Sequence, residues 1–285
     1  IGNRAFGDNL VDVFSGNIGA DNGTWMYMDL SEYAIIKGCS NLCPNELIIP
    51  SAIEGKIVIA IDHLAFAEKW LTSVEIPDSI ISIGDRAFQK NLLTNIHFGS
   101  AITRIGKAAF WNNKLTDINI PNSVTSIGDN AFEYNELNSV IIGNSVKNIG
   151  SKAFTNNLLT SLTIPDSVTS IGASAFSYNQ LTNVSSGYTS SIAKDAFQGN
   201  SQFTFTVTIS DTVTSISKNH SLESFLNSNP ASSVVINIPD SVTSIEAYAF
   251  SDMQLSSVNI PDSVISIGSH AFSGNRLTSV TLPEG

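Results

Sequence analysis

The sequence predicts a right-handed α/β-type solenoid of 22-residue units, with a parallel β-sheet on its concave side and short helical turns on its convex side. An Ala-Phe pair recurs every 22 residues, its phenylalanine falling at Phe66, Phe88, Phe110, Phe132, Phe154 and Phe176. The pair slips by one residue to Phe197, is lost for a stretch, and returns at Phe250 and Phe272. A repeat of this length, with several apolar positions per unit, is typical of solenoids whose stacked units bury a continuous core.

One unit runs from Leu115 to Glu136 and shows what each position contributes. Its apolar residues are Leu115, Ile118, Ile120, Val124, Ile127, Ala131 and Phe132. Ile118 and Ile120 alternate with polar residues, which predicts a short, half-buried strand. Pro121 marks the end of that strand, because proline cannot donate to a sheet. We expect the Ala-Phe segment to form one helical turn, with the ring filling the core.

Two further positions of the unit are glycine and asparagine. Glycine follows the isoleucine of the Ile127 type at Gly84, Gly106, Gly128, Gly150, Gly172 and Gly268. Asparagine lies three residues after the phenylalanine at Asn9, Asn91, Asn113, Asn135, Asn157, Asn179, Asn200 and Asn275. Asparagine side chains bond readily to nearby backbone groups. We therefore expect a structural role for this row, in the turn before each strand.

The repeat resembles a known family. The unit L-T-S-L-T-I-P-D-S-V-T-S-I-G-A-S-A-F-S-Y-N, at 159–179, resembles the BspA-type leucine-rich repeat of bacterial surface proteins. Residues 47–61 look like the longer opening unit of that family, and residues 25–39 like the hairpin that precedes it. The resemblance implies a leucine-rich-repeat superhelix with an N-terminal β-hairpin, and a surface-exposed or secreted protein linked to adhesion and partner binding. It supplies no catalytic residues.

The chain divides into three parts on this pattern. Residues 1–16 are expected to be the tail of a preceding repeat, residues 17–46 a linker and N-terminal capping hairpin, and residues 47–285 the solenoid. The repeat is irregular at about 184–235, where residues 221–227 suggest a short helix in place of the usual turn. Both ends match the interior of a repeat, so we expect a longer protein with any signal peptide, anchor or enzymatic domain outside these residues.

Composition limits the partners and the location. The net charge is −11, with only 14% charged residues, which disfavours nucleic acid and anionic membranes as partners. The sequence contains no run of 18 apolar residues, so it predicts no membrane insertion. We expect an extracellular or cell-surface location. Cys39 and Cys43 either form a local disulfide, if a turn brings their Cα atoms within about 7 Å, or remain free thiols.

Neither a catalytic site nor a cofactor or metal site is predicted. The four histidines are scattered, none with a cysteine or histidine at ligand spacing, and no phosphate-binding loop occurs. A calcium ladder along the Pro-Asp loops is a weaker alternative, because alternate repeats lack the aspartate. The resemblance to the BspA-type family, with the solenoid and the composition, implies a non-enzymatic interaction module.

Two surfaces are candidates for binding. Four aromatic residues follow the Ala-Phe pair along one edge of the solenoid: Trp70, Trp111, Tyr134 and Tyr178. We assign the last three to one column. The concave face offers His97, Asp117, Asn119, Asn237 and Asn259 among serines and threonines. We favour the aromatic edge, because hot spots are rich in Trp and Tyr; the other reading is that these rings only pack. The hypotheses are binding of a protein on a host or neighbouring cell, glycan binding, or a rigid spacer that presents another domain.

Overall fold

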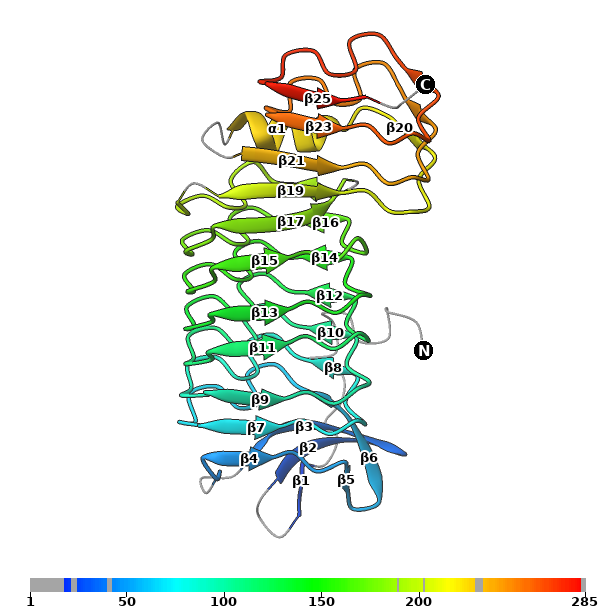
Figure 1. Cartoon of the computed structure of the whole chain (residues 1–285). Coiled ribbons are helices and arrows are strands. Elements are labelled where there is room, and N and C mark those ends of the chain that lie inside the picture. Colours follow the sequence, from blue (N-terminus) through cyan, green and yellow to red (C-terminus); the bar gives the residue numbers. More distant parts are fainter. Residues whose placement is uncertain are drawn as a thin grey trace.

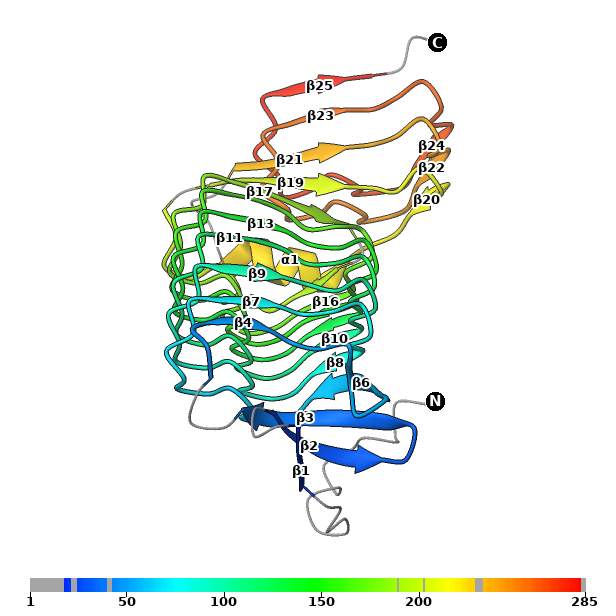
Figure 2. The same cartoon turned by 90° about the horizontal axis from the view of Figure 1, so that it is seen from below.

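The computed structural model describes residues 18–21, 25–39, 43–188, 190–201, 203–228 and 233–282. In these residues the chain forms a parallel β-solenoid whose coils stack along one axis (Figure 1). Seen from below, successive coils superpose, so residues 22 apart lie in rows (Figure 2). The predicted solenoid is confirmed. The expected tail at residues 1–16 lies outside the described residues.

The longer strands of the coils form what we call the front face. It contains β4 (Glu46–Ile48), β7 (Ser73–Glu75), β9 (Asn95–His97), β11 (Asp117–Asn119), β13 (Ser139–Ile141), β15 (Ser161–Thr163), β17 (Asn183–Gly187), β19 (Thr204–Thr208), β21 (Ser233–Asn237), β23 (Ser257–Asn259) and β25 (Ser279–Thr281). Their central residues point inward, as in Val74 and Leu162. Where neighbouring front strands pair, they pair in parallel.

A second row of two-residue strands forms the side face of the coils. After β6 (Lys56–Ile61) come β8 (Ser82–Ile83), β10 (Arg104–Ile105), β12 (Ser126–Ile127), β14 (Asn148–Ile149), β16 (Ser170–Ile171) and β18 (Ser191–Ile192). A separate three-stranded ladder follows, made of β20 (Ser215–Ile216), β22 (Ser244–Ile245) and β24 (Ser266–Ile267). The side face is therefore interrupted between β18 and β20.

The N-terminal end of the stack is covered by the predicted hairpin. β2 (Trp25–Leu30) and β3 (Tyr33–Cys39) pair antiparallel, and β3 continues the side face by pairing with β6. β5 (Ala52–Ile53) also pairs with β6. A further strand, β1 (Ile18–Asp21), pairs antiparallel with β2 inside the segment that we interpreted as a linker. The antiparallel strands close this end of the core over Phe66.

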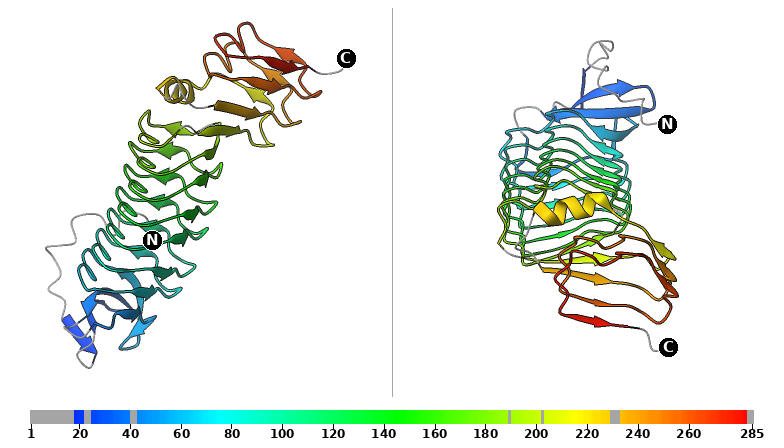
Figure 3. Two further views of the ribbon diagram at one scale, coloured as in Figure 1. Left: turned by 60° about the vertical axis from the view of Figure 1, so that its left-hand side comes forward. Right: turned by 90° about the horizontal axis from the view of Figure 1, so that it is seen from above.

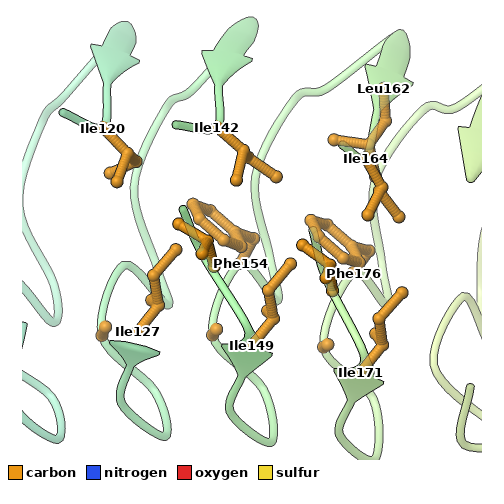
Figure 4. Packing of buried hydrophobic residues seen from close by; sticks show 14 of the residues in the cluster. Ile120, Ile127, Ile142, Ile149, Phe154, Leu162, Ile164, Ile171 and Phe176 are labelled. Carbon is orange, nitrogen blue, oxygen red and sulfur yellow. The ribbon is translucent and has the colours of Figure 1, made fainter. Parts of the chain in front are cut away.

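The core consists of rows of identical side chains. Ile120 and Ile142 lie above one another, as do Ile127, Ile149 and Ile171, with Phe154 and Phe176 between the two sets (Figure 4). The phenylalanine rings from Phe66 to Phe197 stack with centroids 5.2–5.4 Å apart. Offset stacking at this separation is favourable for aromatic rings. One unit alone could not bury these side chains, so the stack itself makes the core.

The Ala-Phe segments are turns and not the helical turns that we expected. In the second coil, Arg86 and Lys90 on either side of Ala87-Phe88 have φ of 56° and 54°, which no α-helix allows. The backbone bonds instead to the next coil, as in Phe88 N to Ala109 O at 2.8 Å. Only one helix occurs in the described residues, α1 (His220–Ser228), and it lies in the predicted irregular segment.

The asparagine row holds the turns together, as predicted. Asn135 is buried; its Oδ1 accepts from Leu115 N of the preceding coil at 3.2 Å. Its Nδ2 donates to Phe110 O of that coil at 3.0 Å and to Phe132 O of its own coil at 3.1 Å. The same three bonds recur at Asn113, Asn157, Asn179, Asn200 and Asn275.

Proline and glycine alternate at the end of the front strands, and this alternation groups the coils in couples, that is, in pairs of neighbouring coils. Residues at the end of the front strands alternate as Pro77, Gly99, Pro121, Gly143, Pro165 and Gly187. A Cβ on Gly99 would lie 2.3 Å from Pro77 O, and one on Gly143 equally close to Pro121 O. Each glycine therefore lets its strand approach the preceding coil. The sheet breaks on the other side of these strands, between β9 and β11 and between β13 and β15.

The irregular segment joins two stacks. Figure 3 shows the C-terminal coils displaced to one side of the N-terminal stack, with α1 at the junction. Phe225 of α1 covers the first row of rings, 5.5 Å from Phe197. Tyr188 covers the second row, 5.8 Å from Phe250. Each row of rings thus ends on an aromatic residue of the junction.

Tyr188 also fixes the second stack by hydrogen bonding. Its hydroxyl lies 2.5 Å from Ser217 O and 2.9 Å from Ala249 O, and Asn219 Nδ2 donates to Tyr188 O. Burial raises the pKa of the Tyr188 phenol well above its ordinary value, so the group stays protonated as a donor.

We predict that Asn135→Ala lowers the free energy of unfolding by about 2–4 kcal/mol, because it leaves one buried N–H and two buried carbonyls without their partner. Urea unfolding followed by circular dichroism measures this. Asn138→Ala, at an exposed position of the same coil, is the control and should cost less than about 0.5 kcal/mol. Equal effects of the two substitutions would contradict the role of the row.

We predict that Tyr188→Phe lowers the stability of the C-terminal stack by about 1–2 kcal/mol, because Ser217 O and Ala249 O lose a shared donor. Hydrogen exchange by mass spectrometry should show faster exchange in residues 244–282. The control is Tyr178→Phe, whose ring is exposed. Unchanged exchange in Tyr188→Phe would show that the ring alone fixes the junction.

Candidate functional site

The turn that follows each phenylalanine presents side chains to solvent. The residue two positions after the phenylalanine is left-handed in every regular coil: Lys90, Asn112, Tyr134, Asn156 and Tyr178 have φ of 52–57°. The next residue is the buried asparagine, which is bonded inward. The residues on either side of it must therefore point outward, so the turn forms a rigid edge whose exposed side chains are free to vary.

Trp111 and Tyr134 come together on this edge. Their rings meet edge to face with centroids 6.2 Å apart. Tyr134 is 51% exposed and Trp111 is half-buried. The ammonium group of Lys90 lies 5.9 Å from the centre of the Trp111 ring, within the range of a cation–π contact. The result is one aromatic pair with a cation beside it.

Our assignment of the three aromatic residues to one column is wrong. Tyr134 and Tyr178 lie two residues after their phenylalanines, but Trp111 follows Phe110 directly. The Trp111 ring nevertheless contacts the Tyr134 ring of the next coil. Tyr178 lies two coils beyond Tyr134 and packs over Gly199, where a Cβ would come within 2.6 Å of the ring.

Sequence reasoning missed the aliphatic members of this edge. Leu92 and Leu158 lie four residues after their phenylalanines and are 40% and 38% exposed. Trp70, at the same position of the first coil, is 72% exposed. Six successive coils thus each present one large side chain, and we call this row the turn strip: Trp70, Leu92, Trp111, Tyr134, Leu158 and Tyr178. An outward apolar residue next to the buried asparagine was the signal available.

Two ion pairs lie along the turn strip. Lys90 Nζ lies 2.9 Å from Glu68 Oε1, and Lys114 Nζ lies 2.8 Å from Glu136 Oε1. All four side chains are about half exposed, so these pairs add little stability. Their effect is to keep the strip locally near neutral on a chain with a net charge of −11.

The front-face candidates fall into two separate groups. His97, Asp117 and Asn119 are exposed on β9 and β11, near the N-terminal end. Asn237 and Asn259 pair on β21 and β23, several strands away. No single row of the sheet runs through both groups, because Ser185 pairs with Thr206, whereas Thr208 pairs with Gly187. This shift of two residues separates the groups, so they do not form one site.

The two cysteines are oxidised. Cys39 and Cys43 form a disulfide, with their Cα atoms 5.5 Å apart, as one of our two alternatives held. Within the described ranges, no three His, Cys, Asp or Glu side chains converge in a way that could hold a metal ion. No helix in the described part of the chain has both the length and the apolar character needed to cross a bilayer.

The repeat can now be compared with known families. The model of the BspA type leucine-rich repeat region matches residues 59–183 and 221–285, in six copies. The chain belongs to this family. The gap between the two matched stretches coincides with the junction, where the coils lose their regular length. The BspA-type repeat is thus carried by both stacks.

The chain is similar to solved structures. The pneumococcal vaccine antigen PcpA is 21% identical, with a TM-score of 0.52 over 94% of this chain and 82% of that one. A leucine-rich cell surface protein from Faecalibacterium prausnitzii is 25% identical, with a TM-score of 0.49 over 95% of this chain and 77% of that one. No match to a curated protein was found.

We predict that the turn strip tolerates residues taken from the other coils of this chain. Trp111→Gln, Tyr134→Asn and Tyr178→Asn install the residues found at the equivalent positions Gln89 and Asn112. Asparagine suits a left-handed backbone, so the triple variant should lose no more than about 1 kcal/mol. Thermal unfolding measures this. A loss of several kcal/mol would show that these rings serve packing.

Proposed function

We propose that the chain is a non-catalytic binding module of an extracellular or cell-surface protein, and that it binds a protein partner on a host or neighbouring cell through the turn strip. The observation that carries the proposal is the row itself. Core positions of the repeat are nearly invariant, yet six successive coils place a large apolar side chain at turn positions where burial does not require one.

The chemistry of the strip supports a protein partner. Protein-binding hot spots are enriched in Trp and Tyr, and they cluster in patches with a polar rim. Trp111 and Tyr134 supply such a pair, and the Lys90–Glu68 and Lys114–Glu136 pairs supply the rim. Stacked coils lie about 4.8 Å apart, so six coils give a strip of roughly 25 Å, comparable to one side of a small interface.

The location is supported by the disulfide and by family membership. Disulfides persist in oxidising compartments and are rare in the cytosol. Cys39 and Cys43 are joined, and the chain carries BspA-type repeats. The front-face residues His97, Asp117, Asn119, Asn237 and Asn259 form the second candidate surface, which serves as a comparison in the test below.

The test is binding of the fluorescently labelled chain to a panel of mammalian and bacterial cells, measured by flow cytometry. We predict at least a tenfold loss of binding for the triple variant Trp111→Gln, Tyr134→Asn and Tyr178→Asn. Binding should also be lost when the cells are treated with protease. The matched control is His97→Asn, Asn119→Thr and Asn237→Thr on the front face, which should bind as the unmodified chain does.

Other results would overturn the proposal. Loss of binding after glycosidase treatment, but not after protease treatment, would establish a glycan partner. Loss in the front-face variant alone would move the site to that face. Absence of binding to every cell type, with an intact fold, would leave the role of a rigid spacer.

A further inference from the structure

The front face is hollowed at the junction of the two stacks, away from the turn strip. The hollow has a volume of about 440 Å³ and lies beside the loop that follows β15. Volumes of this size are within the range of small-ligand sites. The residues around it that carry the argument are Asn144, Thr163, Pro165, Asp166, Ser185 and Thr208.

The hollow exists because one couple of coils fails to close. At Gly99 and Gly143 the glycine strand lies against the carbonyl of the preceding proline. At Gly187 the nearest atom to a Cβ is instead Asp166 Oδ1, at 3.2 Å. β17 continues straight to Gly187 and pairs with β19, so it does not turn over the Pro165 loop.

The loop above is diverted as well. In the regular coils, Asp78 Oδ1 accepts from Ser100 N at 2.7 Å and Asn122 Oδ1 accepts from Asn144 N at 2.9 Å. The residue 22 after Asp166 is Tyr188, whose backbone N instead donates to Thr208 O at 2.8 Å. The Asp166 carboxylate is left to accept from the Thr208 hydroxyl, at 2.9 Å, across two coils.

The polar groups around the hollow are all hydrogen-bonding groups, and none of them is positively charged. One carboxylate, one primary amide and four hydroxyls surround the apolar ring of Pro165. No lysine, arginine or histidine lines the hollow, and Asp166 repels anions. A carboxylate with hydroxyl and amide neighbours can accept and donate hydrogen bonds to a ligand that carries several hydroxyl groups.

We infer that this hollow is a binding site for a neutral saccharide unit, with the Asp166 carboxylate accepting hydrogen bonds from adjacent sugar hydroxyls. Asn144, Thr163, Ser185 and Thr208 supply further partners, and Pro165 supplies the apolar contact. The site contains no aromatic ring, so affinity for a single sugar is weak. It lies on the front face and is independent of the protein-binding role proposed for the turn strip.

The test is saturation-transfer NMR of the full chain with free neutral monosaccharides, glucose, galactose, mannose and N-acetylglucosamine, together with an array of immobilised neutral and sialylated glycans. We expect saturation transfer to at least one neutral sugar. A signal from free sugars alone would indicate capture of a soluble saccharide. A signal that is stronger on the array would indicate a cell-surface glycan.

Two variants and one control decide the site. Asp166→Asn keeps an oxygen for Thr208 but removes the charge, and Thr163→Phe fills the hollow from an exposed position. Each should reduce saturation transfer at least fivefold with an unchanged circular dichroism spectrum. Asp78→Asn, in the same loop of an earlier coil, should bind like the unmodified chain. Three results would overturn the inference: no transfer to any neutral sugar, transfer in both variants as strong as in the unmodified chain, or a preference for sialylated glycans.

Discussion

The bonding of each buried asparagine to the coil before it is the constraint on which the rest of the structure depends. Asn135 satisfies Leu115 N and two phenylalanine carbonyls in a turn that has no helix or strand to pair them. A buried amide left without a partner costs more free energy than one hydrogen bond contributes. Neighbouring coils therefore stack with their turns aligned, so that each asparagine reaches its partners in the preceding coil. The phenylalanine rings then fall 5.2–5.4 Å apart, and the isoleucine rows follow.

This constraint also separates structure from function along the chain. Inward positions repeat because each coil must match its neighbours, whereas outward turn positions touch only solvent or each other. The turn strip occupies such positions, and residues such as Asn112 and Asn156 show that the turn forms equally well without an aromatic residue. The hollow arises differently, at Gly187, where the coil changes length and a couple of coils cannot close.

Much of the fold could be predicted from the 22-residue period, because stacking converts a sequence repeat directly into spatial rows. The conformation of the Ala-Phe turns could not, since Ala-Phe flanked by polar residues does not reveal that Arg86 and Lys90 are left-handed. The contact of Trp111 with Tyr134 joins two different positions of neighbouring repeat units. Aligning the repeats predicts contacts only between equivalent positions, so it does not predict this one. The hollow depends on a register shift of two residues that becomes visible only when Ser185 is paired with Thr206.

The most direct test of the central constraint is amide hydrogen exchange, read residue by residue by NMR. The amides concerned donate to asparagine side chains of the following coil: Leu71, Leu93, Leu115, Leu137 and Leu159. The account predicts that they exchange as slowly as the strand amides of the core. Exchange as fast as that of amides in an unstructured peptide would show that the asparagine row does not hold the coils together.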